Sequence, residues 1–307
     1  MPDIKLFNIS NNNLTELEGK SVTIEKSLQS LIEDNLETLL GVKFLATEYS
    51  TGIKHKGRID TLGIDENNCP VIIEYKRSTN ENVINQGLYY LDWLLDHKAE
   101  FQLLVMKTSG PKVAENIVWN GSRMICIAGD FTKYDTYAVE QINRNIELYR
   151  YKKFGQIFLL ELINSVNVPI IHDKKSNKQK EKVAGKRYAT VAELLSKSSK
   201  DVQDRYATLK DFILNLGDEV QEKELLYYFA FKRIKTFAST EIHPKTSSIM
   251  LYLRLPVEMA KKEIESGFIR DVSNIGHLGV GNLSITIKTG DDLEKAKPFI
   301  FKSYEVG

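Results

Sequence analysis

Residues 57–77, GRIDTLGIDENNCPVIIEYKR, constrain the fold of this chain more than any other stretch. Two runs rich in β-branched residues, 57–64 and 70–76, flank the turn-forming cluster Asp65-Glu66-Asn67-Asn68. This pattern predicts a β-hairpin. A turn centred on its midpoint also sets the pairing of the two strands, so the hairpin determines which of its charged side chains meet.

With the turn centred on Asn67, Asp60 lies directly opposite Glu74, and Arg58 lies opposite Lys76. Side chains opposite one another in antiparallel strands lie roughly 5 Å apart at Cβ. Glu74 and Lys76 are two residues apart on one strand, so both point to the same face. The sequence therefore predicts two facing carboxylates beside an ammonium group.

Two facing carboxylates repel each other unless a cation lies between them. Mg²⁺ or Mn²⁺ suits such hard oxygen ligands and keeps bound waters that can act on a phosphate. Lys76 could then position or deprotonate a water, or stabilise transition-state charge. The alternative is a solvated strand face with surface ion pairs. The apolar run Val71-Ile72-Ile73 before Glu74 favours a site, because charges on a buried strand are unusual.

The remaining patterns predict an α/β fold in residues 1–168: a mixed sheet flanked by helices. Residues 188–307 are expected to form a smaller α+β domain with a largely antiparallel sheet, behind a linker at 169–187. The expected helices of the first domain cover 22–40, 80–96 (capped by Asn80) and 134–149, and its strands cover 44–49, 57–64, 70–76, 101–107, 123–128 and 156–163. In the second domain we expect helices at 191–196, 201–215, 256–266 and 291–304, and strands at 235–242, 249–255, 268–272 and 283–288.

Charge is distributed unevenly along a chain whose formal net charge is +1. Residues 1–164 carry an excess of four acidic groups, 172–187 an excess of five basic groups, and 188–307 none. This excludes a polycationic binder but permits a local nucleic-acid site. The two cysteines, Cys69 and Cys126, lack metal-ligand spacing and are expected to be free and apolar. No membrane span or secretion signal is evident, so we expect a cytoplasmic protein.

The hairpin residues carry a family resemblance. Asp60, followed by Glu74-Tyr75-Lys76, resembles the signature of the PD-(D/E)XK nucleases. With Gly57-Arg58-Ile59-Asp60 and Gln86-x-x-x-Tyr90, the stretch is most similar to the NucS/EndoMS-type endonucleases. The likeness covers roughly 22–130 and implies a restriction-endonuclease-like fold. The chain lacks a sizeable domain before its first helix, so mismatch specificity is not carried over. Residues 188–307 resemble a bacterial domain of unknown function.

The resemblance also implies roles for individual residues. Asp60 and Glu74 would be metal ligands for Mg²⁺ or Mn²⁺, and Lys76 the catalytic lysine. Gln86 would line the site, with Tyr90 one helical turn further on. A glutamate of the first helix, Glu33 or its rival Glu37, would complete the metal and catalytic set.

Basic residues around the hairpin are candidates for contacts with DNA phosphates. Lys54 and Lys56 precede the first strand, and Arg77 follows the second; Arg58 opposes the expected catalytic lysine. For both lysines a solvated strand edge is an equal alternative. Aromatic residues of the helix at 80–96, Tyr90 among them, could stack on bases, although core packing is the commoner use of such spacing.

The function expected from these observations is metal-dependent hydrolysis of DNA phosphodiester bonds, in repair or defence. The rival is a catalytically idle nuclease-fold module that binds nucleic acid or a protein partner. A homodimer is left open. The glycines of 276–281 could suggest a nucleotide loop, but without strand-to-helix context they predict a tight turn between strands, and His277 a loop histidine.

Overall fold

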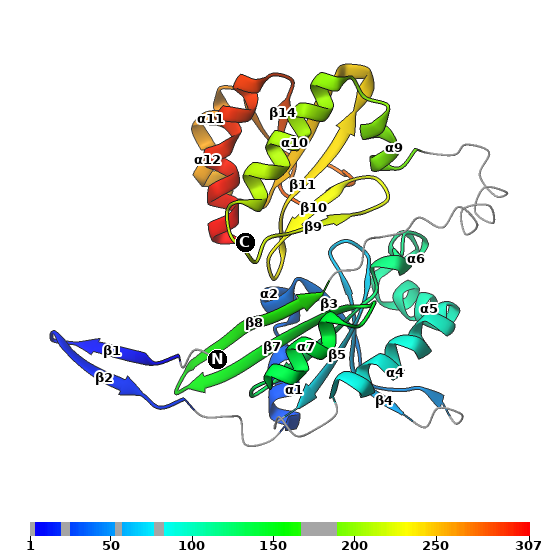
Figure 1. The fold of residues 1–307 in the computed structure, drawn as a ribbon, viewed down its shortest axis with the longest axis vertical. Helices are drawn as coiled ribbons and strands as arrows, with labels where there is room; N and C mark the ends of the chain where they lie inside the picture. Colours follow the sequence, from blue (N-terminus) through cyan, green and yellow to red (C-terminus); the bar gives the residue numbers. More distant parts are fainter. Residues whose placement is uncertain (1–3, 20–24, 53–56, 77–82, 167–188) are drawn as a thin grey trace. The chain divides into compact units, whose positions relative to one another are not determined.

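The computed structural model describes residues 4–19, 25–52, 57–76, 83–166 and 189–307, which fall into two compact units, 1–168 and 169–307 (Figure 1). The predicted linker, the beginning of the predicted first helix and the expected cap Asn80 lie outside the described residues. Each unit is described by itself below. No helix in the described part of the chain is long and apolar enough to cross a membrane.

The first unit contains a six-stranded mixed sheet in the order β3-β4-β5-β6-β7-β8. β5, β6 and β7 run parallel, and the remaining neighbours pair antiparallel. The strands of the first unit are β1 (Leu6–Ser10), β2 (Asn13–Leu17), β3 (Val42–Ser50), β4 (Arg58–Asp65), β5 (Pro70–Lys76), β6 (Arg123–Ala128), β7 (Asn145–Phe154) and β8 (Ile157–Val166). The first two, β1 and β2, pair with each other outside the six-stranded sheet. The helices of this unit are α1 (Glu25–Glu33), α2 (Leu36–Leu40), α4 (Val83–Asp96), α5 (Lys98–Ser109), α6 (Pro111–Glu115) and α7 (Lys133–Glu140), with a short 3-10 turn η1 (Trp119–Gly121).

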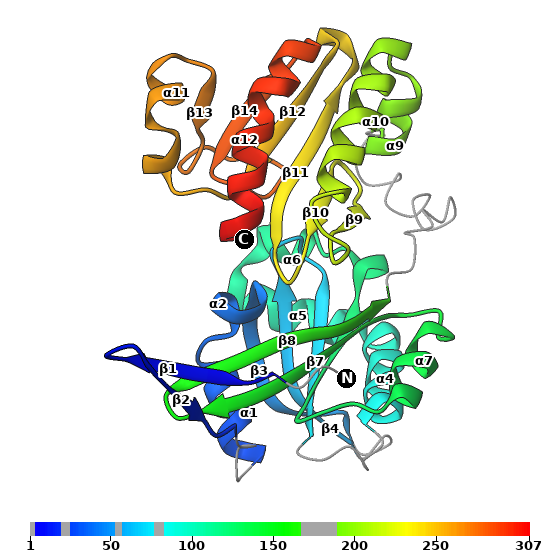
Figure 2. The same ribbon diagram turned by 60° about the vertical axis from the view of Figure 1, so that its left-hand side comes forward.

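Helices cover both faces of this sheet, as expected for an α/β fold (Figures 1 and 2). α1 packs against β4 and β5 on one face. α4, α5 and α7 share a buried cluster with the other face, which includes Leu62, Ile72 and Met124. The strands between these layers are almost wholly buried, which explains the continuous apolar run of residues 71–73 in β5.

Two predictions for the first unit are wrong. Residues 101–107 form part of α5 instead of a strand: Phe101 and Val105, four residues apart, turn inward while Leu103 and Met106 remain exposed. The prediction failed because a short apolar run in a sequence does not distinguish a buried helix from a strand. The predicted helix at 134–149 ends at Glu140, and β7 begins at Asn145. The hairpins β1–β2 and β7–β8 and the break between α1 and α2 were not predicted.

The second unit is a six-stranded antiparallel sheet in the order β13-β14-β12-β11-β10-β9. Its strands are β9 (Gln221–Glu224), β10 (Phe229–Lys232), β11 (Thr236–His243), β12 (Ser248–Leu253), β13 (Ile269–Asp271) and β14 (Leu283–Ile287). Its helices are α9 (Val191–Ser196), α10 (Lys200–Leu214), α11 (Lys261–Glu265) and α12 (Gly290–Val306), with 3-10 turns η2 (Pro244–Thr246) and η3 (Val257–Ala260). This confirms the α+β prediction, to which the structure adds β9 and β10.

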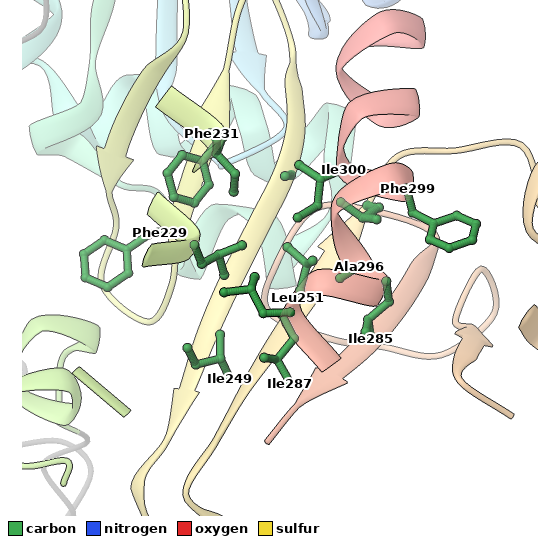
Figure 3. Close-up of a cluster of buried hydrophobic side chains, with 14 of the residues drawn as sticks. Phe229, Phe231, Ile249, Leu251, Ile285, Ile287, Ala296, Phe299 and Ile300 are labelled. Atoms are coloured by element: carbon green, nitrogen blue, oxygen red, sulfur yellow. The ribbon is translucent and has the colours of Figure 1, made fainter. Parts of the chain in front are cut away.

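The core of the second unit lies between one face of its sheet and the helices α9, α10 and α12. Ile249 and Leu251 of β12 and Ile285 of β14 alternate onto this face and meet Ala296 and Ile300 of α12 (Figure 3). Capping boxes at Thr190 and Thr289 begin α9 and α12 by satisfying the first backbone N–H groups of each helix.

Two smaller predictions can be compared with the structure. Cys69 and Cys126 form no disulfide and are buried, as expected. The glycine-rich stretch lies between two strands, as expected, but in a long loop between β13 and β14 instead of a tight turn; Gly279 packs so closely on Ser239 that a Cβ there would lie 2.4 Å from its Oγ. His277 is held in this loop by carbonyl oxygens of Ile275 and Gly281.

Candidate active site

The hairpin of β4 and β5 brings Asp60 and Glu74 together. Thr61 pairs with Ile73 and Leu62 with Ile72, and the same register continued by one pair sets Asp60 opposite Glu74, as predicted. The Asp60 N–H donates to Glu74 Oε1 at 3.2 Å, and the Tyr75 N–H donates to Asp60 Oδ2 at 3.0 Å. Each carboxylate therefore accepts a backbone hydrogen bond from the opposite strand.

Glu74 lies in a strongly unfavourable place for a negative charge. Its side chain is fully buried, and burial followed by the nearby charge of Asp60 raises its pKa to about 9. The charge of Lys76, at the end of the same strand, lowers the pKa by less. Glu74 Oε2 is buried and has no hydrogen-bond partner within the described part of the chain. Such an atom is costly unless something binds it.

The two glutamates proposed for the first helix occupy different places. Glu33 ends α1, and its Oε1 accepts hydrogen bonds from Thr61 Oγ1 at 2.6 Å and Gln29 Nε2 at 3.0 Å. The first helix ends before α2 begins, so Glu37 lies on a separate helix and is exposed. Of the two, only Glu33 is joined to the strand that carries Asp60.

The network around Glu33 reaches the backbone of Asp60 itself. Gln29 Nε2 also donates to the carbonyl oxygen of Asp60 at 2.8 Å, and the Thr61 hydroxyl lies 3.2 Å from the Tyr75 hydroxyl. Sequence reasoning missed Gln29 and Thr61. The available signal was a glutamine one helical turn, four residues, before Glu33, next to the apolar residues Leu28 and Ile32.

Gln86 and Tyr90 lie on α4, on the same side of the sheet as Glu74. Gln86 Nε2 donates to the Tyr90 hydroxyl at 3.3 Å, and that hydroxyl accepts the Arg58 N–H at 3.1 Å. Tyr90 is only 6% exposed, so the expectation that it stacks on bases is wrong. It holds the chain that leads into β4. Gly57 is required there, since a Cβ would lie 2.5 Å from Tyr90 Cε1.

Of the basic candidates, the structure describes Arg58. Its side chain is exposed and donates to Glu48 Oε2 at 3.0 Å. Lys54, Lys56 and Arg77 lie outside the described residues.

The donor set fits a hard divalent cation with two protein ligands. No three His, Cys, Asp or Glu side chains of the described residues come together as a metal cluster, so Glu33 is not brought into one group with Asp60 and Glu74. Mg²⁺ is nonetheless commonly held by one or two carboxylates with waters completing its shell. The buried, unpartnered Oε2 of Glu74 beside the carboxylate of Asp60 is the observation that a cation would explain.

A second polar cluster lies along the same edge of the sheet. Lys76, Ala128 and Arg150 form one row across the parallel strands. Arg150 is buried, and its guanidinium binds Glu161 Oε2 at 2.6 Å and Asp130 Oδ1 at 3.4 Å. These contacts hold the segment that follows β6 close to the strand end that carries Lys76.

Comparisons with known proteins found one family model and one relative that spans most of the chain. Residues 191–307 match a family model described as a domain of unknown function, DUF5655. An uncharacterized protein of Haemophilus influenzae is 31% identical over 297 residues, which cover 95% of this chain and 96% of that protein. The chain therefore belongs to the same protein family as the Haemophilus protein.

Two solved structures were also matched. A repair endonuclease from Pyrococcus abyssi is 21% identical, with a TM-score of 0.29, over 43% of this chain and 48% of that one. An EndoMS complex with double-stranded DNA is 21% identical, with a TM-score of 0.26, over 43% of this chain and 47% of that one. The match thus spans about half of each solved chain, and at these TM-scores it does not establish a shared fold.

Proposed function

We propose that the first unit is a metal-dependent endonuclease domain of the PD-(D/E)XK type, which hydrolyses DNA phosphodiester bonds. The proposal rests on one observation above all: the hairpin register places the carboxylates of Asp60 and Glu74 side by side, with one oxygen of Glu74 buried and unpartnered. The signature Asp60…Glu74-x-Lys76 and its Gly-Arg-Ile-Asp context support it.

Asp60 and Glu74 would hold Mg²⁺ or Mn²⁺. When bound, such an ion polarises a phosphoryl oxygen and lowers the pKa of its water. The protein's own groups do the remaining work. Lys76 carries a positive charge at the end of β5, where it can stabilise charge that develops on the phosphate oxygens. Gln29 and the Tyr75 N–H fix the backbone and the carboxylate of Asp60, respectively.

Roles for Glu33 and Gln86 are part of the same proposal. Glu33, through its hydrogen bond with Thr61, would hold β4 in place and add negative charge near the metal-binding carboxylates. Gln86 would line the site from α4. Arg58, with Lys54, Lys56 and Arg77, would hold the DNA backbone beside the scissile bond.

The test is cleavage of single-stranded, duplex, flap and mismatched DNA with Mg²⁺ or Mn²⁺. We expect Asp60→Ala and Lys76→Ala to lower the rate at least 100-fold. Lys43→Ala, at an exposed lysine paired with Ile64 near the opposite end of the hairpin, is the matched control and should cleave like wild type. Cleavage that survives both site substitutions would refute the site. Binding of DNA without any cleavage would favour an idle nuclease-fold module instead.

Glu33→Gln and Glu37→Gln form a second matched pair. The proposal expects a loss of cleavage for Glu33→Gln and none for Glu37→Gln. Equal activity of the two variants would remove Glu33 from the catalytic set and leave a site of two carboxylates and one lysine.

A further inference from the structure

Two tyrosines on α7 are exposed to an unusual degree. Tyr134 is 72% and Tyr137 is 66% exposed, and their spacing of three residues places both on one side of the helix. Large side chains scattered singly over a surface are ordinary, but adjacent ones form a patch that commonly marks a binding surface. No role in the site described above requires either ring.

The helix itself is firmly held, so these rings are presented on a fixed support. A capping box between Thr132 and Asp135 begins α7, and Val139 is buried in the core. Asn164 of β8 donates to the Thr136 carbonyl oxygen at 3.1 Å and to Glu140 Oε1 at 3.2 Å. The inner side of α7 is thus used for packing, and the tyrosines are left to the solvent.

The topology places α7 at the edge of the sheet that carries the proposed site. β5 and β6 run parallel, Lys76 pairs with Ala128, and α7 begins five residues after Ala128. Cys126 of β6 pairs with Glu74 across the ladder. The first turn of α7 therefore follows shortly after the strand that lies beside Glu74.

Lysines lie near the rings, although α7 itself also carries the acidic residues Asp135 and Glu140. The Lys133 ammonium lies 5.2 Å from the centroid of the Tyr134 ring. β7, parallel to β6, continues past Arg150 to Lys152 and Lys153 at the same edge, and Lys153 is exposed. Exposed aromatic rings among lysines are the combination with which proteins bind single-stranded nucleic acids, whose base faces are free to stack. In a duplex those faces are covered by neighbouring bases.

We infer that Tyr134 and Tyr137 form a stacking platform for unpaired bases, so that the substrate presents a single-stranded DNA segment to the Asp60–Glu74 site. This inference rests on the proposed nuclease function. Lys133 and the lysines that end β7 hold the backbone of that segment. The start of α7 shortly after β6, the strand paired with the one that carries Glu74, favours DNA over a protein partner.

The experiment measures DNA binding by the full chain with the fluorescence anisotropy of a fluorescein-labelled oligothymidylate and of a duplex of equal length. EDTA is present, so binding is read without cleavage and a failure of the nuclease proposal leaves this test intact. We expect each Tyr→Ala substitution at 134 and 137 to weaken single-strand binding about tenfold, with duplex binding unchanged. The Tyr134→Phe/Tyr137→Phe double variant keeps both rings and should bind like wild type.

Phe44→Ala is the control, since this aromatic is also exposed but pairs with Gly63 toward the other end of the sheet. It should leave binding unchanged. Lys133→Ala should reduce the salt dependence of single-strand binding. The platform is refuted if wild type does not bind oligothymidylate, if the Tyr→Ala variants bind it as wild type does, if they lose single-strand and duplex binding equally, or if the Phe variant loses as much as the Ala variants.

Discussion

The carboxyl group of Glu74 lies on a strand buried on both faces, beside the carboxylate of Asp60, and its pKa is raised to about 9. In the unfolded chain the same group titrates near 4.5. Between these values the folded state keeps a proton that the unfolded state has lost. Stability therefore falls as the pH rises through this window. At pH 7 the cost is on the order of 3 kcal/mol.

Replacing Glu74 with the neutral, similarly shaped glutamine should remove this cost. In EDTA we expect Glu74→Gln to raise the free energy of unfolding by about 1–3 kcal/mol near pH 8 and to change it little below pH 5. Urea unfolding at both pH values measures this. A variant that is less stable than wild type near pH 8 would contradict the burial of a destabilised carboxyl. Added Mg²⁺ should stabilise wild type more than the variant, because the ion binds the folded state.

Gly57 is a second residue whose immediate surroundings determine the conformation of the site, because it lies where the chain enters β4. A methyl group there would lie 2.5 Å from Tyr90 Cε1 and 3.0 Å from Thr51 Oγ1, which accepts the Gly57 N–H at 2.9 Å. Since neither neighbour is a loose side-chain end, we expect Gly57→Ala to destabilise the protein by about 1–3 kcal/mol. Gly290→Ala is the matched control, because no atom lies within 4 Å of a Cβ there. Equal melting temperatures of the two variants would show that Tyr90 moves freely.

Among the elements, the β4–β5 hairpin is anchored at its turn, the end opposite the proposed site. Asp65 Oδ1 accepts the N–H groups of Asn67 and Cys69, each at 2.8 Å, and the other oxygen pairs with Arg123 at the start of β6. Arg123 Nε lies 3.3 Å from Glu147 Oε1 on β7. All three charged side chains are buried, so the turn is tied to two further strands by ion pairs screened from water.

Removing the central cation of this group should be costly. Arg123→Met would leave two buried carboxylates without their partner, and we expect a loss of about 3–5 kcal/mol in the free energy of unfolding. The triple variant Asp65→Asn/Arg123→Met/Glu147→Gln removes all three charges and should lose less. Chemical denaturation of the two variants decides the point: a triple variant that loses as much as the single one would show that the cost comes from packing instead of charge.

At the scale of the whole molecule, each of the two units has a hydrophobic core of its own. The second unit closes one face of its sheet with α9, α10 and α12, all from residues 191–306. We expect a fragment of residues 189–307 to unfold cooperatively on its own, because its core is complete. Circular dichroism during a thermal melt measures this. A fragment without a sigmoidal transition would mean that the core needs the first unit.

Local patterns predicted the elements that depend on neighbours in the chain. The turn cluster at 65–68 and the runs beside it determine the hairpin, its register and hence the meeting of Asp60 with Glu74. The residue pattern of the second domain predicted α9 at its observed bounds and α10 to within one residue at each end. Turn geometry and periodicity act over a few residues, so they can be read without knowledge of the fold.

Other features depend on which strands become neighbours. Whether 101–107 is helix or strand was decided by the cluster into which Phe101 and Val105 pack. The order of the sheet sets β6 beside β5, and this buries Glu74 and brings α7 to the strand ends that carry the site. The packing of α1 against β4 brings Glu33 into contact with Thr61. Sheet order follows from the summed burial of many residues distant in the chain, and no short stretch of sequence records that sum.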